Sequence, residues 1–166
     1  MKKSIIIACL IASGIMSCSK EEGKLPEGAI GYVVDKSENI DLSIKSMKAL
    51  SDGDSATYRS TYSEDAVFYD NADTINLDQN TSLFTAFKAK GITMKLDSIS
   101  NITETIYSKP GYFGATNYVY AYAWFTLTRG DKKARVIIHS VDGIKDGKQV
   151  VEWLRYDTKK VSEIMQ

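Results

Sequence analysis

The chain has 166 residues, with 21 basic and 21 acidic side chains and 43% hydrophobic residues, a composition typical of one globular domain. It carries no basic stripe or Arg-rich tract, which argues against nucleic-acid binding. With one histidine, His139, and two cysteines, Cys9 and Cys18, a multi-histidine or cysteine-rich metal site is excluded. Neither a phosphate loop nor a Gly-x-Gly-x-x-Gly motif occurs, so we expect no metal and no cofactor.

The N-terminal residues are typical of a secretory signal. Lys2 and Lys3 precede an apolar segment from Ile5 to Met16. That segment is too short to span a bilayer, which takes roughly 20 apolar residues, but it has the length of a signal-peptide core. A buried N-terminal helix is the alternative interpretation.

Residues 15–18, IMSC, resemble the bacterial lipobox. The resemblance implies cleavage after residue 17, a signal peptide over residues 1–17, and acyl chains on Cys18 that anchor the protein stably to a membrane. Residues 19–22, SKEE, resemble the signal that carries Bacteroidetes-type lipoproteins to the outer face of the outer membrane; a charged spacer is the alternative. Residues 18–35 are expected to form a lipidated tether, and residues 36–166 the folded domain.

Helical patterns come first in the domain. Residues 37–54 predict an amphipathic helix, because apolar residues recur at spacings of three and four, with Ser37 as N-cap and Gly53 at the C-terminal end. Asp54 is expected to cap a short helix over residues 55–62, which places Tyr58 and Tyr62 on one helical face. A third helix is expected from residue 80 or 81 to residue 90.

Strand patterns dominate the rest of the chain. A short strand is expected over residues 66–69, and longer strands over residues 92–107, 116–128, 134–141 and 149–157. Turns rich in glycine separate the long strands. Helices followed by an antiparallel meander predict an α+β fold, in which helices cover one face of a curved antiparallel sheet.

Three phrases in this order resemble the nuclear-transport-factor-2-like superfamily, which includes SnoaL-like polyketide cyclases and ketosteroid isomerases. They are ALSDGD (residues 49–54), EDAVF (64–68) and DGKQVV (146–151). The resemblance implies a cystatin-like α+β barrel, in which about three N-terminal helices wrap a bent sheet around a cone-shaped apolar pocket. Members bind small hydrophobic ligands, catalyse isomerisation, cyclisation or dehydration, or act as dimerising modules, and the fold does not choose among these roles.

The resemblance to ketosteroid isomerases places the general base at Asp70. Asp70 starting the next loop is the alternative. The isomerase's oxyanion tyrosine falls near Ser46 and its second aspartate near His139 or Ser140, so the donors that stabilise an enolate are poorly matched. Asp70 and His139 are a candidate acid–base pair, and an inert strand histidine is the alternative for His139.

The densest aromatic run is a row of alternating side chains on one expected strand. Tyr118, Tyr120, Tyr122 and Trp124 all point to one face of the sheet, opposite a second apolar row. Because Tyr and Trp are enriched in interfaces, we expect this face to form a homodimer, with a carbohydrate- or polyphenol-binding platform as the alternative. The candidate ligand-binding residues are Tyr58, Tyr62, Tyr69, Trp124, Trp153 and Arg155.

Taken together, the sequence predicts a lipid-anchored protein of the cell envelope, located at the outer membrane, whose domain binds a small apolar or aromatic ligand without catalysis. One alternative is an isomerase, cyclase or dehydratase that uses Asp70 as the general base. Another is a structural dimerising module whose pocket is plugged by its own side chains.

Overall fold

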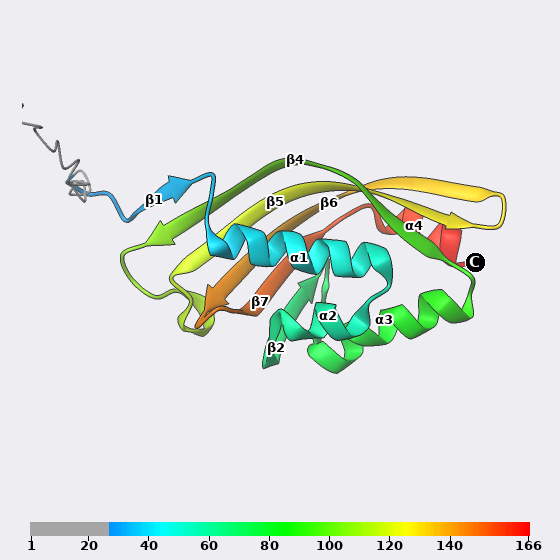
Figure 1. The fold of residues 1–166 in the computed structure, drawn as a ribbon, viewed down its shortest axis with the longest axis horizontal. Helices are drawn as coiled ribbons and strands as arrows, with labels where there is room; N and C mark the ends of the chain where they lie inside the picture. The colour runs from blue at the N-terminus through cyan, green and yellow to red at the C-terminus, as the bar shows by residue number, and fades with distance from the viewer. Residues whose placement is uncertain (1–26) are drawn as a thin grey trace, which may run out of the picture.

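The computed structural model describes residues 27–166, which form one sheet with helices packed against it (Figure 1). The expected signal peptide and the Cys18 lipidation site lie outside the described residues. In chain order the elements are β1 Gly31–Val34, α1 Glu38–Asp52, α2 Ser55–Ser60, β2 Tyr62–Asp70, β3 Asp73–Asn76, α3 Leu77–Ala89, β4 Thr93–Tyr107, a 3-10 turn Tyr112–Gly114, β5 Asn117–Arg129, β6 Lys132–Lys145, β7 Lys148–Arg155 and α4 Thr158–Met165.

The sheet has seven strands in the order β1-β4-β5-β6-β7-β2-β3. All neighbouring strands are antiparallel except β2 and β7, which are parallel. Strand β7 ends the long meander and pairs with the early strand β2. This architecture confirms the predicted α+β fold with a curved antiparallel sheet and helices on one face. No helix within residues 27–166 combines the length and apolar character needed to cross a bilayer.

The predicted caps at both ends of α1 and at the start of α2 are confirmed, because local hydrogen bonds fix them. The Ser37 hydroxyl accepts from the Ile40 amide, and Gly53 ends α1 in the left-handed conformation that glycine favours. Asp54 caps α2 through the Thr57 amide, 2.9 Å away.

Four expectations about the elements are corrected. Helix α3 begins at Leu77 rather than at residue 80 or 81, because Asn76 and Gln79 form a reciprocal capping box. Tyr62 opens β2 instead of continuing a helical face with Tyr58. Strand β1 lies inside the expected tether, where it pairs with the end of β4. Helix α4 follows β7, where the sequence analysis had placed no helix.

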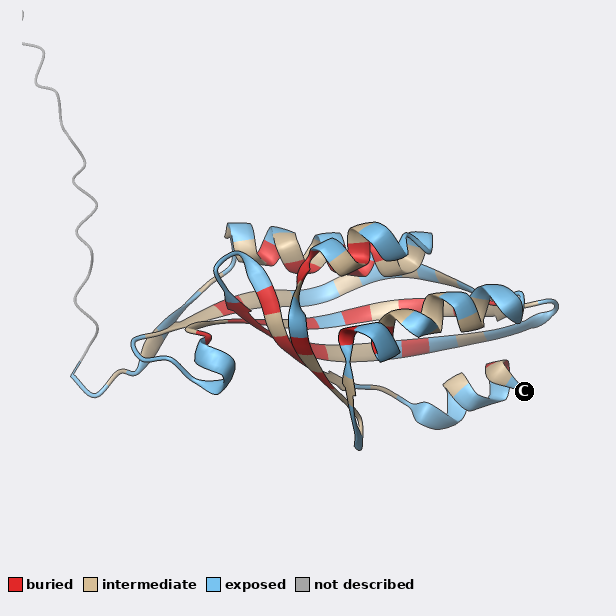
Figure 2. Cartoon of the chain, turned by 90° about the horizontal axis from the view of Figure 1, so that it is seen from below, coloured by how far each residue is buried: buried red, intermediate tan, exposed pale blue. Residues whose placement is uncertain are grey.

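The two faces of β5 divide the domain into a covered side and an open side. The inward row, Val119, Ala121, Ala123, Phe125 and Leu127, is buried under the helices. The outward row contains the exposed Tyr122. Figure 2 shows buried segments gathered where the helices meet the strands. The alternation predicted from the sequence therefore holds from Val119 to Leu127, whereas Tyr118 at the start of the outward row is also buried.

The register between β6 and β7 sets which of their polar side chains face inward. Asp142 lies directly opposite Glu152, and Gly143 opposite Val151, before a bulge shifts the pairing. A side chain at Gly143 would meet the Val151 side chain at 2.5 Å and the Tyr118 ring at 3.2 Å, so only glycine lets the strands approach this closely.

Candidate functional site

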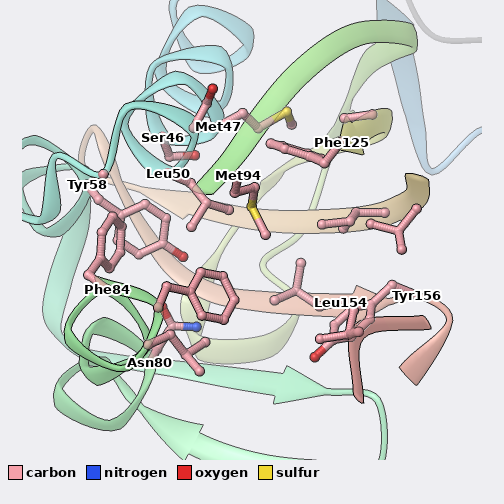
Figure 3. Close-up of a pocket in the computed structure, with 18 of the residues that line it drawn as sticks. Ser46, Met47, Leu50, Tyr58, Asn80, Phe84, Met94, Phe125, Leu154 and Tyr156 are labelled. Atoms are coloured by element: carbon pink, nitrogen blue, oxygen red, sulfur yellow. The ribbon is translucent and has the colours of Figure 1, made fainter. Parts of the chain in front are cut away.

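A cavity of about 570 Å³ lies between the inner face of the sheet and the helices (Figure 3). Side chains of α1, α2 and α3 form one wall, β5, β6 and β7 form another, and Val161 of α4 closes part of the rim. Most lining groups are apolar, among them Met47, Leu50, Phe84, Met94, Phe125 and Leu154. Its volume and lining are those of a pocket for a small organic molecule.

Two buried carboxyl groups lie at the sheet side of this cavity. Glu152 lines the cavity and is 7% exposed, and Asp142, which is 1% exposed, lies beside it. The two residues lie directly opposite each other on β6 and β7, so their acidities are coupled.

Burial is the main cause of the altered acidity of this pair. Removal from water raises the pKa of Asp142 from 3.8 to about 7. Burial, with the adjacent Asp142 charge as the next cause, raises the pKa of Glu152 well above its ordinary value. Both shifts disfavour the doubly ionised state, so at neutral pH the pair carries less than two negative charges.

Two tyrosines extend this polar cluster. The Tyr62 hydroxyl donates to Glu152 Oε2, 2.8 Å away, and its oxygen lies 3.1 Å from the Tyr58 hydroxyl oxygen. The Asn80 side chain lies beside the Tyr58 hydroxyl, and Figure 3 shows both residues on the helix side of the cavity. Burial raises the pKa of both tyrosines well above the usual value, so both remain neutral hydrogen-bonding groups.

Asp70 lines the same cavity at the end of β2. Its Oδ2 accepts a hydrogen bond from the Tyr156 hydroxyl at 3.0 Å, and its Oδ1 accepts from the Asn71 amide at 3.1 Å. Burial and the Asp70 charge raise the pKa of Tyr156 far above the usual value. Asp70 thus combines the two interpretations from the sequence, because it borders the next turn and also faces the cavity.

The structure does not assemble the predicted acid–base pair of Asp70 and His139. Asp70 lies opposite Leu154 in the sheet and faces inward. His139 lies opposite Tyr122, and the centres of their stacked rings are 4.3 Å apart. The two side chains lie on opposite faces of the sheet, and no single substrate in the cavity can contact both.

The predicted ligand-binding residues are divided between the same two faces. Tyr58 and Tyr62 line the cavity. The remaining four, Tyr69, Trp124, Trp153 and Arg155, lie on the outer face. The Arg135 guanidinium lies 4.3 Å from the centre of the Trp124 ring. The rings of Trp153 and Tyr69 are stacked with their centres 5.6 Å apart, and Arg155 donates to the Tyr69 carbonyl.

The sequence analysis missed Asn80, Asp142, Glu152 and Tyr156 as site residues. A signal was present for two of them, since Asp142 and Glu152 are acidic residues inside otherwise apolar strand segments. Their meeting depends on the β6–β7 register, which no local pattern specifies. Within residues 27–166, no group of three or more metal-ligating side chains is arranged to hold a metal ion.

Similarity to known proteins lies in the fold rather than the sequence, since neither a family model nor a curated protein matches the chain. Among solved structures, an LEH-like epoxide hydrolase of M. tuberculosis superimposes with a TM-score of 0.58 and 17% identity over 77% of this chain and 89% of that one. A protein assigned as a polyketide cyclase from Xanthomonas campestris superimposes with a TM-score of 0.61 and 10% identity, over 80% of this chain and 100% of that one. An NTF2-like protein from Burkholderia xenovorans superimposes with a TM-score of 0.54 and 12% identity, over 78% of this chain and 96% of that one.

These similarities show that residues 27–166 have the fold of nuclear-transport-factor-2-like proteins, which is the fold that the sequence motifs indicated. Some proteins with this fold are enzymes, but identities below 20% do not transfer an activity.

The buried carboxyl pair predicts a stability that depends on pH. Because both folded-state pKa values are raised, the folded chain binds more protons than the unfolded chain between about pH 4 and pH 7, so the free energy of unfolding falls as the pH rises through this window. The slope approaches about 1.4 kcal/mol per pH unit for each such group. Denaturant unfolding at several pH values measures this slope.

Asp142→Asn is expected to flatten the slope, whereas Asp131→Asn, at an exposed turn, leaves it unchanged. A wild-type stability that stays constant from pH 4 to pH 7 contradicts the buried pair.

Proposed function

We propose that this protein is a lipid-anchored protein of the bacterial cell envelope that binds a small, largely apolar molecule in its cavity. The observation that carries the proposal is the cavity of about 570 Å³, with apolar walls and a few polar groups at the sheet. A module whose pocket is plugged by its own side chains would not leave this volume open.

We favour binding over steroid-type isomerisation. The Ser46 hydroxyl, at the position of the isomerase tyrosine, donates to the Ser43 carbonyl at 2.8 Å and is not free to stabilise an enolate. Proton transfer by Asp70 is the second candidate, supported by the place of that carboxylate in the cavity wall. An epoxide hydrolase and a protein assigned as a polyketide cyclase have similar structures, which makes catalysis the second candidate for this cavity.

Filling the cavity is expected to block binding of an apolar probe. The neutral dye N-phenyl-1-naphthylamine should fluoresce with the wild-type protein, and Ile138→Trp, inside the cavity, should weaken its binding by about tenfold or more. Ile137→Trp, the next residue on the exposed outer face, is the matched control and should bind as the wild type does.

Leu83→Trp fills the cavity from α3 and serves as a second test in case Ile138→Trp unfolds, which circular dichroism reveals. No fluorescence gain with the wild-type protein, or equal binding by the cavity and surface variants, would falsify the proposed binding.

The proposed anchor is Cys18, at the end of the lipobox-like residues 15–18. Cys18→Ser should abolish incorporation of labelled palmitate and move the protein from the membrane fraction to the soluble fraction, because no acyl chain is attached. Cys9→Ser, within the expected signal peptide, is the control and should leave labelling intact. Continued labelling of the Cys18→Ser chain counts against the anchor.

We also propose a homodimer formed through the outer face of the sheet. The support is the open outer face, where Tyr122 of the aromatic row and Ile137 on the neighbouring β6 are exposed large apolar side chains.

In sedimentation-velocity runs the wild type should sediment as a dimer, and Tyr122→Lys should shift it to a monomer by burying a charge in the interface. Thr85→Lys, on the exposed side of α3, should leave the dimer intact. A monomeric wild type at micromolar concentration rules out this interface.

A further inference from the structure

The charge balance of the cavity limits the ligands that it can accept. Asp52, Asp70 and Glu152 line the cavity, and Asp142 lies directly behind Glu152. Lys88, exposed near the end of α3, is the one cationic residue of the lining. No Arg, Lys or His of the described chain forms an ion pair with Asp70, Asp142 or Glu152. An anionic ligand would therefore be repelled, and a cation would find uncompensated negative charge.

The hydrogen-bonding groups of the cavity lead to the same conclusion. The hydroxyl hydrogens of Ser46, Tyr62 and Tyr156 are donated to acceptors within the protein. The cavity therefore presents mainly acceptor oxygens to a ligand. Ser140 adds an independent sign of a missing partner, because its hydroxyl lines the cavity, is 4% exposed and has no hydrogen-bond partner. A buried polar atom of this kind normally has a partner.

We propose that the ligand is a protonated amine on an apolar body, with its nitrogen between Glu152 and Asp70 and one hydrogen bond to Ser140. This inference rests on the proposed function, because it names the class of molecule that the cavity binds. The ammonium group donates to the carboxylate oxygens, which are charge-assisted contacts. The rings of Phe84, Phe87 and Phe125 enclose the apolar body.

Binding of such a ligand is coupled to proton release. The groups that face Glu152 are Asp142 on β6, Tyr62 and Asp70 on β2, Tyr58 on α2 and, next to Asp142, Ser43 on α1. All of these groups are acidic or neutral, so an incoming ammonium supplies the local positive charge. The carboxyl pair then releases a proton to solvent, and the Glu152 carboxylate pairs with the ammonium nitrogen.

Three probes with one ring system and different head groups test the proposal on the purified protein. They are 1-naphthylmethylamine, 1-naphthalenemethanol and 1-naphthoic acid, each used to displace N-phenyl-1-naphthylamine at pH 7. In the wild type the amine should displace the dye at a concentration about tenfold or more below that of the alcohol, and the acid should be weakest. Calorimetry in two buffers of different ionisation enthalpy should show proton release with the amine and none with the alcohol.

Glu152→Gln should reduce the preference for the amine over the alcohol to less than about threefold while the dye still binds. Asp70→Asn is the second variant if Glu152→Gln fails to fold, and Asp131→Asn is the surface control that should keep the wild-type preference. Displacement by the alcohol as readily as by the amine, or by neither while the dye binds, overturns the amine proposal alone. Failure of the dye itself to bind overturns the cavity proposal, so the two failures are distinct.

Discussion

The pairing of β6 with β7 is the constraint on which the site depends. It sets Asp142 opposite Glu152, so that two carboxyl groups on neighbouring strands point to the inner face of the sheet side by side. A slip of one residue would turn Glu152 to the outer face, because side chains alternate along a strand. Gly143 stabilises this register, since any larger residue would collide with Val151. A feature without a reactive side chain therefore determines the chemistry of the cavity.

The sheet also separates two sets of aromatic and titratable residues that look alike in the sequence. Tyr58 and Tyr62 face the cavity and are fully buried, whereas Tyr122 and His139 stack on each other on the open face. Trp153 lies next to Glu152 in the chain yet contacts Tyr69 on the opposite side. One face can therefore bind a ligand while the other stays available for association, and changes on one face need not disturb the other.

What could be predicted from the sequence follows the range of the interactions involved. The caps at Ser37, Gly53 and Asp54 are fixed within a few residues, and the alternation along β5 is a property of one strand, so both were predicted correctly. Strand β1 was missed because its four residues gain their structure from pairing with β4. The acid–base pair of Asp70 and His139 failed for a similar reason, because only the sheet register decides which face each side chain takes.

The Asp142–Glu152 pair costs stability, and this cost bears on its role. Two carboxyl groups are removed from water without a cation nearby, and an apolar pair of similar volume would avoid that desolvation penalty. The surrounding core does not depend on these carboxyl groups for its packing, because the apolar side chains of Val119, Phe125 and Leu127 are buried there. The pair is partly relieved by Tyr62, whose hydroxyl stabilises only one of its oxygens. A bound cation would neutralise the remaining charge, so the desolvation penalty of the pair favours binding of a ligand of the right charge.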